Sequence, residues 1–256
     1  MSIDFPESMG PRFFDDNALM SSLLAALSVA FPPGERFFIE SVRHYLDGIE
    51  DPTLRAQIRG FIGQEANHTK EHLAFNAFLE RVGYPAMAMQ RWVEKRLKRV
   101  AEVGPPEANL ARTAALEHFT AILATAMLER PELLDTLHPQ AAKLWAWHAI
   151  EEIEHRSVAF DVYRACVDDE ALRLRTMRLV TVMFVTIVSA RTLLMMGSMG
   201  SLTDLRDNLR GLRLLLGEDG LLRRVAPRYL AYYRPDFHPS ELETGEWVER
   251  AKREYL

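Results

Sequence analysis

Two stretches of sequence decide the fold: FIGQEANHTKEHLAF, residues 61–75, and LWAWHAIEEIEHRSVAF, residues 144–160. The first contains Glu65 and His68, and the second contains Glu152 and His155. Residues three apart lie on the same face of an α-helix. Each stretch therefore points one carboxylate and one imidazole in a common direction.

Apolar residues continue both faces at helical spacing. On the first helix they are Leu54, Ile58, Phe61, Phe75 and Leu79, and on the second Ala141, Leu144, Trp145, Ala159 and Val162. Such stripes are the buried faces of amphipathic helices. Burying unpaired carboxylates and imidazoles is costly, so these groups must either form a salt-bridge network or bind cations. Two such stripes facing each other favour a metal site.

Proline and glycine punctuate the rest of the chain as they do at helix ends. The spacing predicts helices over residues 34–48, 52–81, 107–129 and 140–165, with a crossover helix over 86–103. Two hairpins joined by a long crossover are typical of a ferritin-like four-helix bundle. We therefore expect an all-α single domain over 1–256. It comprises a metal-binding bundle at 34–165 and a C-terminal helical extension at 170–256 packed on the bundle.

A dinuclear site in such a bundle needs one more carboxylate from each of the other two helices. Residues equally far from a hairpin turn lie level with each other, which pairs Glu65 with Glu35 and Glu152 with Glu117. Glu40 competes with Glu35 on the first helix, but it falls on a face with charged neighbours. We therefore prefer Glu35 as the ligand.

Further imidazoles lie close to these pairs in the sequence. His148 is one turn before Glu152 on the same face and is a candidate seventh ligand, with a core histidine as the alternative. His72 follows His68 by one turn and is a weaker candidate, expected beside the ligands. His118 is expected to pack next to Glu117. The predicted metal ligands are Glu35, Glu65, His68, Glu117, His148, Glu152 and His155, with His72 as an additional candidate.

Composition narrows the cofactor and the partners. Four carboxylates balance two divalent ions, and carboxylate with imidazole favours two iron ions, with manganese or zinc as alternatives. The single cysteine, Cys166, excludes a disulfide framework within the chain and a thiolate cluster. A net charge of −5 argues against nucleic acid as a partner. The N-terminus lacks the pattern of a secretory signal, so a cytoplasmic location is expected.

The most apolar stretch, residues 180–196, contains Arg191 and is short for a membrane span. We expect a buried helix here. The alternatives are that this stretch contacts a second subunit in a homodimer, a membrane surface or an apolar substrate.

The chain resembles a known bacterial family. The strings FPPGERFFIESVRHY, ALEHFTA and the two stretches quoted above resemble the predicted metal-dependent hydrolases of the ferritin-like group, as does FHP at residues 237–239. The spacing of His148, Glu152 and His155 is also similar to that of the di-iron arylamine N-oxygenases. That second resemblance implies that His148 is a third imidazole ligand.

Three functions are compatible with these features. The first is a non-haem di-iron enzyme that activates O2 to oxidise a small organic substrate, which requires an electron-donor reductase. The alternative is a metal-dependent hydrolase that uses a dinuclear metal-activated water, as the family's description states. Iron storage is the third, but the sequence offers no sign of a cage-forming shell. We expect the oxygenase.

Overall fold

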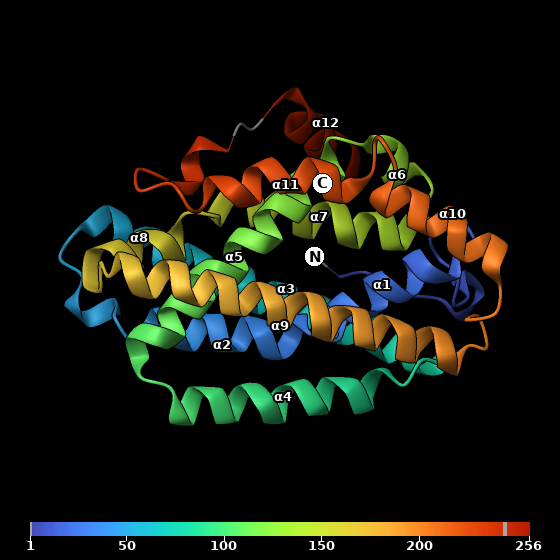
Figure 1. The fold of residues 1–256 in the computed structure, drawn as a ribbon, viewed down its shortest axis with the longest axis horizontal. Coiled ribbons are helices and arrows are strands. Elements are labelled where there is room, and N and C mark those ends of the chain that lie inside the picture. Colours follow the sequence, from blue (N-terminus) through green and yellow to red (C-terminus); the bar gives the residue numbers. More distant parts are fainter. Residues whose placement is uncertain (1, 243–244) are drawn as a thin grey trace.

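The computed structural model describes residues 2–242 and 245–256, and over these residues the regular secondary structure is helical (Figure 1). Within them, the pairing of Phe14 with Leu137 is an isolated bridge and no strand forms. The prediction of an all-α fold is confirmed.

Four helices surround the centre of the molecule: α2 (Phe31–Arg43), α3 (Pro52–Arg81), α5 (Pro106–Leu128) and α7 (Pro139–His155). Helix α2 packs on α3 and α5, and α7 packs on α5 and α3. Helix α4 (Ala86–Val103) joins the two hairpins along the outside of the bundle (Figure 1). This is the arrangement that we predicted for a ferritin-like bundle, and kinship with ferritins stays a prediction.

Local sequence signals explain where the bundle helices begin. The Asp51 side chain accepts a hydrogen bond from the Thr53 N–H, and Pro52 occupies the first helical position of α3. Helices α5 and α7 also begin at prolines, Pro106 and Pro139. The predicted bounds of α3 and α4 agree with the structure, and those of α5 differ by one residue at each end.

Two predicted helices need correction. The first begins at Phe31 rather than residue 34 and ends at Arg43, after which residues Leu46–Gly48 form a 3-10 turn. The fourth is interrupted after His155, and α8 (Val158–Cys166) follows. At this break the Arg156 guanidinium donates to the carbonyl oxygens of Ile153 and Pro239. The Ile153 carbonyl is the acceptor that a continuous helix would pair with the N–H of residue 157, so this side chain replaces the helical bond.

The remaining helices cover the bundle. Helix α1 (Ala18–Ser28), which the sequence analysis did not predict, packs against α9 (Glu170–Ser198), α10 (Leu205–Leu216) and α3. Helix α9 also lies on α5, as does α11 (Leu221–Ala231), while α12 (Glu246–Tyr255) packs on α7. The other short elements are α6 (Pro131–Asp135) and 3-10 turns at Glu7–Met9 and Pro239–Glu241.

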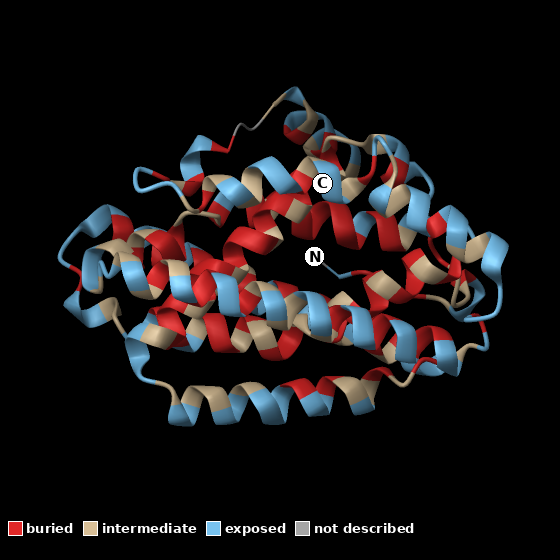
Figure 2. Ribbon diagram, viewed as in Figure 1, coloured by how far each residue is buried: buried red, intermediate tan, exposed pale blue. Residues whose placement is uncertain are grey.

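Burial follows this layering (Figure 2). Helices α5 and α7 are buried along most of their length, whereas the outward side of α9 is exposed. The prediction that residues 180–196 form a buried helix is therefore wrong for the outer face, where Val182 is 65% and Leu194 is 63% exposed. Ala18–Gly48 and Glu170–Ser198 are both long and apolar enough to cross a membrane, with 72% and 33% of their apolar windows buried.

Candidate metal centre

Glutamate and histidine side chains from four helices meet in the centre of the bundle. Each is at least 96% buried. Helix α2 contributes one carboxylate, α5 another, α3 a carboxylate and an imidazole, and α7 a carboxylate and two imidazoles. They are Glu35, Glu117, Glu65, His68, Glu152, His148 and His155.

The contacts among these side chains bring both Glu-x-x-His pairs to one point. The His155 Nε2 atom lies 3.0 Å from Glu65 Oε1 and 3.4 Å from Glu117 Oε2. The His148 Nε2 atom lies 2.9 Å from Glu152 Oε1, and His68 Nδ1 lies 3.6 Å from the same oxygen. Helices α3 and α7 thus present their imidazoles to carboxylates of the facing helix and of their own.

Potential ligand atoms gather within 4.8 Å of one another in four overlapping sets. One set joins Glu35, Glu65 and His68, and another joins Glu65, Glu152 and His155. The two remaining sets are His68, His148 and Glu152, and Glu35, His72 and His148. Five residues belong to two of these sets each, namely Glu35, Glu65, His68, His148 and Glu152, and among them Glu65 and Glu152 are the carboxylates of helices α3 and α7. Glu117 belongs to none of the four and contacts the cluster through His155.

Many of the buried ligand atoms approach one another at ion-pair distances without forming a hydrogen bond of regular geometry. Both oxygens of Glu65 and of Glu117, one oxygen each of Glu35 and Glu152, and Nε2 of His148 and His155 have no hydrogen-bond partner among the described residues. An unpaired buried polar group destabilises a fold by about 1–3 kcal/mol, and more when it is charged. Divalent cations would satisfy the many oxygen and nitrogen atoms that meet in this volume. The set of side chains therefore suits a metal centre.

The pKa shifts in the cluster also indicate that the buried carboxylates need a neutralising positive charge. Burial, together with neighbouring carboxylates, raises the pKa of Glu35 and of Glu117 well above the usual range of the side chain. Burial and the adjacent His148 lower the pKa of His68 well below its usual range. Without metal, therefore, protons must neutralise the carboxylates of Glu35 and Glu117. A bound cation can take the place of these protons.

The pKa values of Glu152 and His155 are shifted in the opposite direction to those of the other carboxylates and of His68. Burial alone would raise the pKa of Glu152, but the imidazoles of His148 and His155 hold it well below its usual range. Burial alone would lower the pKa of His155, but Glu152 and Glu65 raise it well above. Glu152 is thus the carboxylate that is ionised most readily.

A chain of hydrogen bonds fixes the orientation of His148. The Asn76 amide N–H donates to the Ser28 carbonyl oxygen, which turns Asn76 Oδ1 toward the Ser28 hydroxyl. The hydroxyl donates to that oxygen at 2.7 Å and so accepts from the His72 Nδ1–H at 2.9 Å. His72 Nε2 must then accept from the His148 Nδ1–H, at 2.7 Å. His148 Nε2 therefore faces Glu152 Oε1 at 2.9 Å, and in a neutral imidazole this is the nitrogen left to bind a metal ion.

The other two imidazoles have outer partners as well. His68 Nε2 lies 3.0 Å from Glu151 Oε2, and the second oxygen of Glu151 accepts from the Trp147 indole N–H. The His155 Nδ1–H donates to Gln64 Oε1 at 3.2 Å. These contacts leave Nδ1 of His68 and Nε2 of His155 directed at the carboxylates, in keeping with the outer partners of metal-bound histidines.

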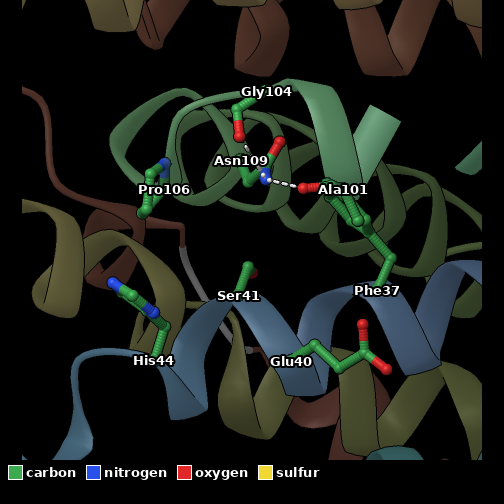
Figure 3. Close-up of a pocket in the computed structure, with 8 residues that line it drawn as sticks. All are labelled: Phe37, Glu40, Ser41, His44, Ala101, Gly104, Pro106 and Asn109. Atoms are coloured by element: carbon green, nitrogen blue, oxygen red, sulfur yellow. Dashed lines mark hydrogen bonds between the residues drawn. The ribbon is translucent and has the colours of Figure 1, made fainter. Parts of the chain in front are cut away.

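The structure separates the competing candidates. Glu40 is exposed and lines a pocket of about 180 Å³ between α2 and the turn joining α4 to α5, together with Ser41 and His44 (Figure 3). Glu35 is 1% exposed and lies in the cluster, where it accepts from the Thr69 hydroxyl. His118 Nε2 donates to the Arg228 carbonyl oxygen outside the cluster, as expected for a packing residue.

Sequence reasoning missed several residues around the cluster, namely Ser28, Gln64, Thr69, Asn76 and Gln90. Asn76 lies one turn after His72, so the face that contains Glu65 and His68 carried a signal for it. Ser28 lies on the unpredicted helix α1, so nothing in the spacing of the motifs pointed to it.

The fold and the cluster together define an all-α protein with a buried carboxylate and imidazole site that could hold metal. The chain belongs to the family described as predicted metal-dependent hydrolase, whose model matches residues 1–243. No curated protein matches the chain, and neither does any solved structure. The predicted family membership is confirmed, whereas similarity to the arylamine N-oxygenases stays a prediction.

Proposed function

We propose that the protein is a hydrolase that holds two divalent cations between α2, α3, α5 and α7. The observation that carries the proposal is the set of buried carboxylate and imidazole atoms without hydrogen-bond partners. The description of the family supports hydrolysis over the oxidation expected from the sequence. Two such ions, when bound, supply a nucleophilic water at neutral pH and polarise the bond to be cleaved.

The position of each residue in the cluster suggests which ion it would bind. Glu65 and Glu152 lie in two overlapping sets each and would bridge the ions, while Glu35 and His68 would complete one side. His155 and Glu117 would complete the other side, with His148 as a third imidazole donor. Iron is the metal that we propose first, with manganese or zinc as alternatives, because the donors are oxygen and imidazole nitrogen without thiolate.

The surrounding aromatic side chains exclude bulk water, and two buried carboxyls can hold protons. Ring contacts join Phe61 to His155, Trp147 to His68 and Phe31 to His148, with centroids 4.6–4.9 Å apart. Burial and neighbouring carboxylates raise the pKa values of Glu35 and Glu117, so these carboxyls retain protons more readily than exposed ones.

One observation favours O2 activation by a di-iron site as a second candidate. Each of the three imidazoles packs against an aromatic ring and all seven side chains are buried, which suits redox chemistry that must be shielded from water. This function requires a reductase as electron donor, O2 as co-substrate and a small organic substrate.

Both candidates are tested on protein purified anaerobically and loaded separately with ferrous iron, manganese or zinc. Ester, amide and phosphoester probes are then assayed with and without O2, and O2 consumption is followed after addition of a reductant. Hydrolysis that needs metal but not O2 supports the hydrolase. Reductant-dependent O2 consumption by the iron form, without hydrolysis of any probe, overturns it in favour of the second candidate.

A further inference from the structure

Exposed apolar side chains gather on the C-terminal helices. Of the fifteen large hydrophobic residues that are exposed in the described part of the chain, twelve lie between residues 179 and 230. We call the part on α9 and α10 the C-terminal apolar face. It consists of Leu179, Val182, Val185, Leu193, Leu194, Leu205, Leu209, Leu212 and Leu216, each 41–72% exposed. Exposed apolar surface of this extent marks a site of interaction.

Helix α10 is amphipathic, but much of its apolar side faces solvent instead of the core. Its buried residue is Gly211, which lies against the start of α1, where a Cβ would lie 2.6 Å from Asn17 Oδ1. Its leucines at 205, 209, 212 and 216 face solvent, at the spacing of a single helix face. The close approach of the backbone thus anchors α10 to the protein while its apolar side points away from the core.

Helix α9 carries the other exposed apolar side chains of the face. Both helices pack on α1, and α9 crosses in front of the bundle helices (Figure 1). From residue 179 to residue 198 the charged position of α9 is Arg191, whose guanidinium is buried and lies over the Trp92 ring. The outer face of α9 is therefore uncharged over this length, with pale exposed segments visible in Figure 2.

Positive charge borders the C-terminal apolar face. Residues 170–231 contain ten arginines and five acidic residues, whereas the whole chain has a net charge of −5. Arg175 at the start of α9 and Arg206 and Arg213 on α10 are exposed and have no ion-pair partner among the described residues. Asp207 is already held by Arg210 and Asn17, so it does not neutralise them. The face thus combines leucines with unpaired arginines.

We propose that the C-terminal apolar face binds the surface of an anionic lipid bilayer. Exposed leucines enter the boundary between head groups and acyl chains, and arginines contact the lipid phosphates, as in interfacial amphipathic helices. A second copy of this chain would instead bring the same unpaired arginines together across the contact, which like charges oppose. Spanning is disfavoured because α9 buries Arg173, Met177 and Met195 against the rest of the protein.

The proposal is independent of the metal chemistry and is tested with the full chain and vesicles. Co-sedimentation is measured with phosphatidylcholine vesicles that contain or lack phosphatidylserine, at low and high salt. We expect binding that requires phosphatidylserine and weakens in salt. Arg206→Gln with Arg213→Gln should weaken binding about 25-fold, since each interfacial arginine contributes about fivefold. Leu209→Gln with Leu212→Gln should weaken it about tenfold or more.

Matched controls change equally exposed residues elsewhere. Arg43→Gln with Arg59→Gln, and Val103→Gln with Leu256→Gln, should bind vesicles as the unchanged chain does. Equal binding to both vesicle types, or equal losses in controls and test variants, overturns the proposal. So does a dimer in sedimentation equilibrium that the leucine variant converts to a monomer without any change in vesicle binding, because the occupant is then a second copy.

Discussion

His72 Nε2 lies 2.7 Å from His148 Nδ1, and this contact determines which nitrogen of His148 faces the carboxylates. His72 is itself oriented by the Ser28 hydroxyl. Both ring nitrogens of His72 are engaged in this chain of hydrogen bonds, whereas Nε2 of His148 is directed at Glu152 in the cluster. Of these two imidazoles, His148 is therefore the ligand that we propose and His72 positions it.

Replacing His72 should weaken metal binding without preventing folding. His72→Phe removes the acceptor of the His148 Nδ1–H, and loss of such a partner lowers metal affinity about 10–100-fold. The dissociation constant and the visible spectrum of the cobalt-substituted protein both measure the effect. His118→Phe is the matched control, because His118 is equally buried but bonds the Arg228 carbonyl outside the cluster. Equal losses in the two variants would show a general packing effect instead.

Glu152→Ala should empty the site, whereas Glu40→Ala should leave the metal content unchanged. Glu152 contacts His148, His155 and His68, while Glu40 is exposed at the pocket shown in Figure 3. Metal analysis of the purified variants measures the outcome. Full metal content in Glu152→Ala would contradict the assignment of the bridging carboxylate.

The sequence was sufficient for those parts of the site that depend on helical spacing. Glu65 with His68 and Glu152 with His155 each follow from one helix, and Glu35 and Glu117 follow from the length of a hairpin. These positions lie within regular helices whose register is set over many residues. Distances along a helix and across a short turn are therefore predictable from spacing alone.

Other features depended on contacts that spacing does not encode. The break after His155 results from the Arg156 side chain, whose acceptor at Pro239 is distant in sequence. The orientation of His148 depends on Ser28, which approaches through the packing of α1 on α3. The apolar character of residues 180–196 was recognised, but which side of α9 would be covered depends on where α1 and α5 lie.

Stability of the metal-free protein should fall as the pH rises through neutrality. Glu35 and Glu117 have raised pKa values in the fold, so the folded state retains protons that the unfolded state has lost. Their contribution is present at acidic pH and is lost as each carboxyl ionises, and the raised pKa of His155 acts in the same direction. The lowered pKa values of Glu152, His68 and His72 act oppositely, but their contribution is complete once the pH exceeds the ordinary pKa of histidine. Thermal unfolding across the pH range measures this.

Added metal should remove that loss of stability. Cations replace the protons of Glu35, Glu117 and His155, so binding should release protons and tighten as the pH rises. Calorimetry in buffers of different ionisation enthalpy measures the protons released. A metal affinity that is independent of pH would contradict protonated carboxyls in the metal-free cluster.

Phe61→Ala should destabilise the fold by about 3–5 kcal/mol, as expected for truncation of a buried aromatic ring. Phe61 is 1% exposed and its ring centroid lies 4.9 Å from that of His155. The variant should also admit water to the cluster, so metal should dissociate faster from it. Denaturant unfolding and chelator competition measure the two effects, and unchanged stability would show that the neighbouring side chains close the gap.

The central claim is that four helices assemble a site for two cations, and metal stoichiometry tests it most directly. Protein purified without O2, stripped with a chelator and titrated with ferrous iron should bind two ions per chain. Glu65→Ala combined with Glu152→Ala should bind none, because these carboxylates lie in all but one of the four ligand sets. An unchanged chain that binds no divalent metal at any tested concentration would contradict the account.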